Sequence, residues 1–154
     1  MQGFLYALFF TMLITACGDR EHSAAVPLPD SPITLRVVLN HSHPYLAEYD
    51  RWLILERGGH VQSKTKLFPD TGGYASVNVY RVDSEVVLLT QGDDDYHIDL
   101  QSGRLTKTPK VRGKGRSQVL GEFLGVFDFD TDGTWQFIPA SFRPEQTIEP
   151  DQYK

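Results

Sequence analysis

Apolar and polar residues alternate with a two-residue period in successive short segments between residues 33 and 139. In the segment 33–40, aliphatic residues occupy alternate positions and share one face, while mostly polar residues share the other. This period is typical of half-buried strands, because successive side chains of a strand point to opposite faces. No segment keeps a helical period over several turns. The pattern therefore predicts an all-β domain.

Turn residues separate these segments and pair them into hairpins. Gly58-Gly59 divides an apolar run from a more polar returning run within residues 51–67, and residues 101–103 and 131–133 separate further pairs of short strands. Glycine favours such turns because it adopts positive φ without strain. Sequential hairpins predict a single antiparallel meander, folded as a sandwich or a small barrel. We expect further strands at 74–82 and 85–91, and one helical turn near 44–50.

The two ends of the chain lack this alternation. Residues 18–32 contain three prolines and small residues, which predicts a flexible tether that spans on the order of 20 Å. Residues 141–154 are polar and contain two prolines, which predicts a surface or disordered tail. The folded β-domain is therefore expected at 33–140.

The first residues form an uncharged, mostly apolar run from Gly3 to Ala16. The run is shorter than the roughly 20 apolar residues of a permanent membrane-spanning helix, and it has the length of a signal-peptide core. It stops at Cys17, and a strongly polar stretch follows. The small residues Thr15 and Ala16 precede the cysteine, as cleavage requires. Residues 1–16 are therefore expected to be a removable signal peptide.

The segment LITAC at 13–17 resembles the lipobox of bacterial lipoproteins, which has an aliphatic residue, two small residues and a cysteine. In that family the cysteine thiol receives a diacylglycerol, the preceding peptide is removed, and the new amino group is acylated. The resemblance implies that Cys17 is the lipid-modified first residue of the mature protein. Gly18 follows it instead of the aspartate that retains lipoproteins in the inner membrane, which implies the outer membrane, facing the periplasm. We assign the β-domain itself to no family.

Composition agrees with this interpretation and excludes one class of partner. The chain contains one cysteine, and acylation of its thiol removes the hazard of unwanted pairing in an oxidising compartment. The net charge is −5, which argues against nucleic acid as a partner, because phosphate binding needs a basic face. The basic cluster at 110–116 is flanked by glycines and is interpreted as a solvated loop.

The segment DFDTDG at 128–133 is the sharpest motif of the domain. Asp128, Asp130 and Asp132 alternate like the first ligands of a calcium loop, but Pro139 stands at the twelfth position, where such a loop needs a bidentate glutamate. The alternating phenylalanines and the Asp-Gly pair fit a strand followed by a tight turn. We therefore prefer a hairpin and keep the three aspartates as an alternative calcium site.

Two other groups could bind ions or partners. Asp93, Asp94 and Asp95 follow one another in an expected loop. They fit a solvated turn that discourages edge-to-edge pairing; the functional alternative is a cation site or a contact for a basic partner. His41 and His43 would share one side of a strand end, but no third ligand is near in sequence, so we assign no zinc.

No nucleophile elbow, phosphate loop or metalloprotease helix occurs in the sequence. We therefore expect a protein without enzymatic activity and without a required cofactor. The preferred function is that of a lipid-anchored periplasmic protein whose β-domain binds another protein, such as a toxin to be neutralised or a component of envelope assembly. The alternatives are a small-molecule or calcium binder and, least favoured, an envelope hydrolase.

Overall fold

The computed structural model describes residues 21–43, 45–46, 48–67, 69–70, 72, 76–90, 94–109 and 121–144. In these residues the chain forms ten β-strands and no helix, which confirms the all-β prediction. The strands are β1 (His22–Pro27), β2 (Ile33–His41), β3 (Tyr49–Arg57), β4 (His60–Lys66), β5 (Val77–Val82), β6 (Glu85–Thr90), β7 (Asp94–Asp99), β8 (Leu105–Pro109), β9 (Glu122–Phe129) and β10 (Trp135–Pro139).

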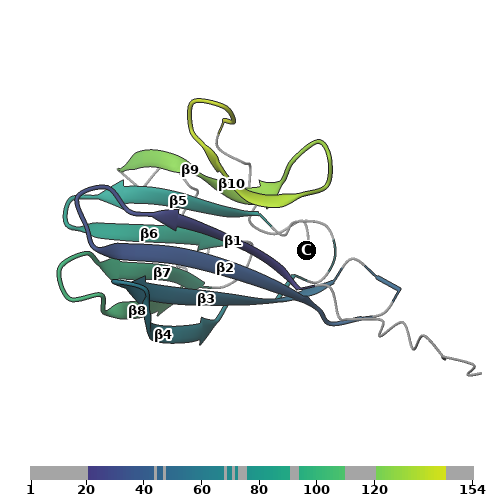
Figure 1. The fold of residues 1–154 in the computed structure, drawn as a ribbon, viewed down its shortest axis with the longest axis horizontal. Helices are drawn as coiled ribbons and strands as arrows, with labels where there is room; N and C mark the ends of the chain where they lie inside the picture. Colours follow the sequence, from purple (N-terminus) through teal and green to yellow (C-terminus); the bar gives the residue numbers. More distant parts are fainter. Residues whose placement is uncertain are drawn as a thin grey trace, which may run out of the picture.

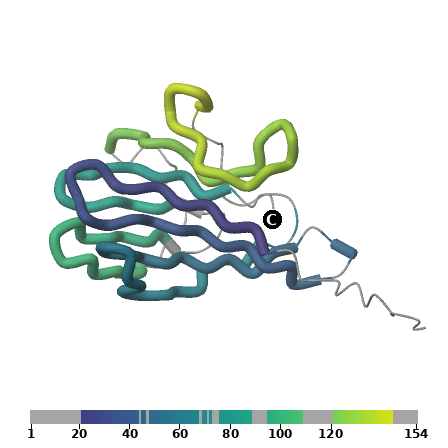
Figure 2. The backbone as a smooth tube through the Cα atoms, in the orientation of Figure 1, coloured from purple at the N-terminus to yellow at the C-terminus, as the bar shows by residue number. Residues whose placement is uncertain are grey.

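The strands form two sheets that pack face to face as a sandwich (Figure 1). One sheet has four strands in the order β1-β2-β3-β4, and the other has six in the order β10-β9-β5-β6-β7-β8. All neighbouring strands are antiparallel. Sequential hairpins account for both sheets, except that β9 pairs with β5 instead of its predecessor β8. Figure 2 follows the chain through these successive hairpins. The sheets do not close on themselves, so the fold is the sandwich and not the barrel.

The hydrophobic core lies between the two sheets. The alternating aliphatic residues of β2, from Ile33 to Leu39, are at most 2% exposed and pack with inward-facing residues of β3, β5, β6 and β7. Trp135 of β10 also belongs to this core, and its Nε1 donates a hydrogen bond of 3.2 Å to the carbonyl of Val37 in β2. The indole thus ties an edge of the six-stranded sheet to the four-stranded sheet.

The first strand lies in the segment assigned to the tether, and this corrects the domain boundary. His22 pairs with Leu39, and the ladder continues to Pro27 opposite Thr34. Ala24 is buried against the core. Pro27 has no backbone N–H to donate to a neighbouring strand. Proline is tolerated in β1 because β1 is an edge strand, and the N–H groups on the open side of an edge strand have no partner strand. The β-domain therefore begins at His22, and residues 18–21 alone separate it from Cys17.

Two further expectations concern the loops and the tail. No helical turn forms among the described residues of 44–50, and β3 begins at Tyr49. The chain is ordered past residue 140, because the N–H groups of Phe142 and Arg143 donate to the carbonyl of Pro139 at 2.9 and 3.2 Å. The rest of the expected tail, 145–154, lies outside the described residues. No helix in the described part of the chain is long and apolar enough to span a bilayer.

A charged residue lies in the core. Arg51 of β3 faces inward and is fully buried. Burial lowers the pKa of its guanidinium to about 10, while the negative charge of Asp70 acts in the opposite direction. Asp70 is also buried, and its backbone exchanges hydrogen bonds of 2.9 and 3.1 Å with that of Tyr49. The sandwich thus encloses a cation and places a carboxylate near it.

Candidate functional site

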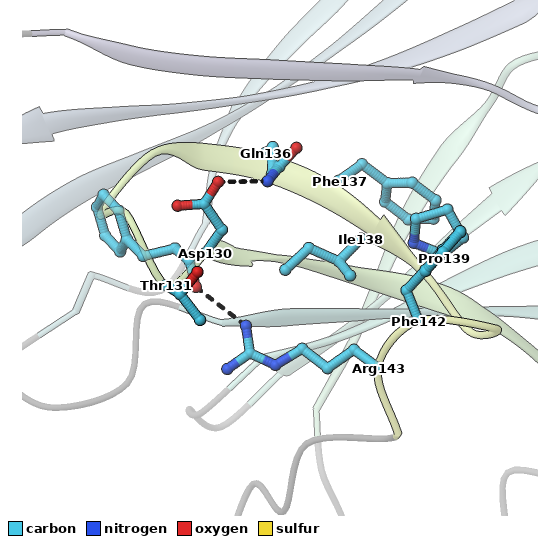
Figure 3. A pocket seen from close by; sticks show the side chains of 9 residues that line it. Asp130, Thr131, Gln136, Phe137, Ile138, Pro139, Phe142 and Arg143 are labelled. Carbon is cyan, nitrogen blue, oxygen red and sulfur yellow. Dashed lines mark hydrogen bonds between the residues drawn. The ribbon is translucent and has the colours of Figure 1, made fainter.

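A hollow with a volume of about 640 Å³ lies over the β9–β10 hairpin (Figure 3). Its lining comes from the hairpin turn, from β10 and from the turn that follows β10. The residues that matter to its chemistry are Asp130, Thr131, Gln136, Ile138, Phe142 and Arg143.

The β9–β10 hairpin has one face toward the core and one outer face. Trp135 and Phe137 of β10 point toward the core, where their rings lie 5.2 Å from Phe129 and 5.1 Å from Phe127. Alternate side chains of β10 face the opposite way, because the side chains of a strand alternate. The hollow therefore lies on the outer face of the six-stranded sheet, with Ile138 as an apolar part of its lining (Figure 3).

Asp130 closes the hairpin turn. Its Oδ1 accepts hydrogen bonds from the backbone N–H groups of Asp132 at 2.9 Å and Thr134 at 2.8 Å. Its Oδ2 accepts one from the side-chain amide of Gln136 at 2.6 Å (Figure 3). Both carboxylate oxygens thus face N–H donors, as in the turns that aspartate stabilises. This arrangement supports the hairpin interpretation of the motif.

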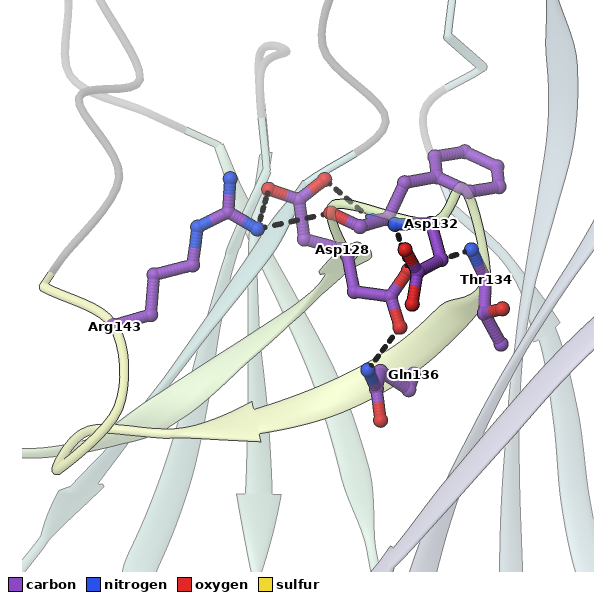
Figure 4. A network of polar contacts seen from close by, with 7 residues as sticks. Asp128, Asp132, Thr134, Gln136 and Arg143 are labelled. Atoms are coloured by element: carbon purple, nitrogen blue, oxygen red, sulfur yellow. Dashed lines mark hydrogen bonds and ion pairs between the residues drawn. The ribbon is translucent and has the colours of Figure 1, made fainter.

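Arg143 links the turn that follows β10 to β9. Its Nη1 lies 3.1 Å from Asp128 Oδ2 and donates to the carbonyl of Phe129 at 3.0 Å (Figure 4). The side chain of Asp128 is 13% exposed, so the ion pair is partly shielded from water and is stronger than a fully exposed one. The same turn leaves Phe142 82% exposed beside the hollow.

The three aspartates proposed as calcium ligands therefore have different surroundings. Asp128 pairs with Arg143, Asp130 caps the turn, and Asp132 is exposed. Among the residues that the structure describes, no group of three or more His, Cys, Asp or Glu side chains could hold a metal ion.

We expect that Asp130→Ala destabilises the domain by about 1–2 kcal/mol, because the N–H groups at the turn lose their acceptor. Thermal unfolding with and without calcium chloride measures this loss. The hairpin interpretation predicts that calcium leaves the melting temperature of the wild-type protein unchanged. A rise that Asp130→Ala abolishes would show instead that the turn is a calcium site.

The other predicted site residues lie elsewhere. Asp94 begins β7, and Asp95 continues the ladder opposite Leu89 and Thr108, so this acidic group extends into a strand. Asp93 lies outside the described residues, as do Cys17 and the basic cluster at 110–116.

The two histidines considered as a pair have different neighbours. The ring of His41 lies 4.6 Å from that of Tyr49 and 5.8 Å from that of His22. The ring of His43 lies 6.1 Å from that of Tyr45. Both histidines thus belong to aromatic contacts near the start of β3.

Sequence reasoning missed the contacts of Phe142 and Arg143. It assigned both residues to a polar tail, because the pattern of strands stops at Pro139, although Phe142 is one of the aromatic residues from which a binding surface could be built. The signal that could have found them is an aromatic residue next to a cation, Phe142-Arg143, in an otherwise polar segment. This segment follows the hairpin, in which the carboxylate of Asp128 needs a counter-charge.

No family model matches this chain, and no curated protein or solved structure shows a significant match to it.

Proposed function

We propose that this chain is a lipoprotein of the bacterial envelope, anchored in the outer membrane by acyl chains on Cys17 and facing the periplasm, whose β-sandwich binds a protein partner. The anchor is supported by the LITAC segment and by the polar sequence after it. Each buried methylene of an acyl chain contributes about 0.8 kcal/mol, and several chains on one residue hold a protein firmly.

The observation that carries the partner-binding part is the exposed aromatic beside the β9–β10 hollow. Phe142 is 82% exposed and is held by a turn that Arg143 ties to Asp128. Interfaces are enriched in aromatic residues and arginine, and their strongest contacts are anchors that fill pockets. A partner side chain inserted against Ile138 would bury Phe142 as well. This surface therefore has the composition and shape of a protein-binding site.

The charge of the chain favours one kind of partner. With a net charge of −5, the protein attracts a basic partner, and complementary charge accelerates association. A basic toxin delivered to the periplasm and a basic component of envelope assembly both fit this description.

Purification of the lipidated protein from detergent-solubilised envelopes tests the proposal. We expect the wild-type protein to recover a stoichiometric protein partner. Phe142→Ala should weaken that binding by about 2 kcal/mol, roughly thirty-fold. Tyr45→Ala is a matched control, because Tyr45 is 90% exposed in the segment between β2 and β3 and is not among the residues that line the hollow. Equal recovery by all three proteins, or recovery of no stoichiometric partner, would overturn the proposal.

A further inference from the structure

The outer face of the four-stranded sheet carries an aromatic residue flanked by two cations. Trp52 of β3 is half-buried, and Lys64 and Lys66 of β4 are exposed. The ammonium of Lys64 lies 4.8 Å from the centroid of the Trp52 ring, and that of Lys66 lies 5.8 Å from it. Together these three residues form the Trp52 patch.

The charges around the patch favour an anionic partner. Arg36 pairs with Glu56 at 2.8 Å, and Lys66 pairs with Asp50 at 2.9 Å. Lys64 adds a third cation to this face, so the strand residues here carry three positive and two negative charges. This face is thus slightly positive, although the whole chain has a net charge of −5.

The register of the strands places the patch beside the start of the domain. Ser23 pairs with Val38, Val38 with Trp52, and Trp52 with Lys66. Neighbouring strands are about 4.8 Å apart, so Trp52 lies about 10 Å from Ser23 across the sheet. Ser23 follows Cys17 by only six residues (23 − 17), and an extended chain of that length spans at most about 20 Å. The patch therefore lies within reach of any membrane that holds Cys17.

We propose that the Trp52 patch docks on the surface of the membrane in which Cys17 is anchored and contacts anionic phospholipid headgroups there. This inference rests on the lipid anchor of the proposed function. Tryptophan is enriched at the level of the headgroups, and lysine covers apolar surface with its stem while its ammonium reaches the headgroup. Anionic lipids attract such basic residues near the surface.

The proposed orientation also leaves the partner site accessible. The Trp52 patch lies on the outer face of the four-stranded sheet, and the β9–β10 hollow lies on the outer face of the six-stranded sheet. A membrane against the first face leaves the second directed into the periplasm. In this orientation the four-stranded sheet contacts the membrane, and the six-stranded sheet binds the protein partner.

Trp fluorescence in proteoliposomes tests the docking. The lipidated mature chain is reconstituted in phosphatidylcholine vesicles with or without phosphatidylglycerol, with bromine-labelled acyl chains as the quencher. The chain has two tryptophans, and Trp135 is buried in the core, so Trp52→Phe reports the background from Trp135.

We expect quenching in vesicles with phosphatidylglycerol, its loss in Trp52→Phe, and its reduction by salt and by Lys64→Glu/Lys66→Glu. Arg104→Glu/Lys107→Glu, at the β8 side of the other sheet, is the charge-matched control and should be quenched like the wild type.

The outcomes separate this inference from the anchor on which it rests. Vesicle-bound protein with acylated Cys17 but equal quenching in the wild type and Trp52→Phe would overturn the docking and leave the anchor intact. If the wild-type protein purified from envelopes carries no acyl chains and does not float with the vesicles, both the anchor and the docking are overturned. Loss of a protein partner in Lys64→Glu/Lys66→Glu, with unchanged quenching, would show that the patch binds a protein and not the membrane.

Discussion

Asp70→Asn is expected to lower the free energy of unfolding by about 3 kcal/mol, because it removes a negative charge that stabilises the buried guanidinium of Arg51. Burial already lowers the pKa of Arg51 from its ordinary value to about 10. A cation whose pKa is lower in the folded state costs stability below that pKa, and the cost is relieved as the pH rises above about 10 toward the ordinary pKa of arginine. Removal of the Asp70 charge lowers the pKa of Arg51 further and increases this cost at neutral pH. Urea unfolding at constant pH measures the difference.

Two further variants make this result specific. Asp50→Asn removes the charge of an exposed ion pair with Lys66 and should cost at most about 1 kcal/mol. Arg51→Met/Asp70→Asn removes both buried charges at nearly constant volume and should recover most of the stability that Asp70→Asn loses. If Asp70→Asn costs no more than Asp50→Asn, the buried charge does not depend on Asp70.

Gly125→Ala is expected to detach β10 and to cost about 3 kcal/mol or more. Gly125 has a φ of +151°, and a Cβ there would collide with the carbonyl oxygen of Ile138 and lie 2.6 Å from the ring of Phe137. These contacts belong to β10, so the strand must move away. Because Trp135 of β10 donates to Val37 across the core, the movement should also expose the indole. Tryptophan emission and urea unfolding report both effects.

Gly133→Ala is the matched control for Gly125→Ala. Gly133 also has a positive φ, +75°, but a Cβ there would meet nothing within 4 Å. Only the backbone strain remains, which costs about 1–2 kcal/mol. Equal losses in the two variants would mean that the close approach of β10 to Gly125 contributes nothing to stability.

Local patterns in the sequence predicted most strands, because alternation reports burial directly. The segment 33–40 shows this well: its aliphatic positions are the buried face of β2. The edge strand β1 escaped detection, because its small residues and proline resemble those of a linker, and its pairing with β2 depends on the rest of the sheet. Edge strands need less apolar surface than central ones, so their pattern is weaker.

The features that depend on distant partners could not be predicted from local sequence. Arg51 faces inward near the carboxylate of Asp70, which lies between β4 and β5. The pairing of β9 with β5 follows from the packing of the whole sheet. The hollow depends on the ion pair of Asp128 with Arg143, which joins a predicted hairpin to an expected tail. The hairpin was predictable, whereas the surface built on it was not.

The mass of the N-terminal peptide of the mature protein, isolated from envelopes, tests the central claim most directly. We expect this peptide to begin at Cys17 and to carry a diacylglycerol on the thiol and a fatty acid on the amino group. Cys17→Ala should retain residues 1–16 and incorporate no labelled palmitate. A peptide that begins at Cys17 without acyl chains, or a wild-type protein that retains residues 1–16, would contradict the lipid anchor.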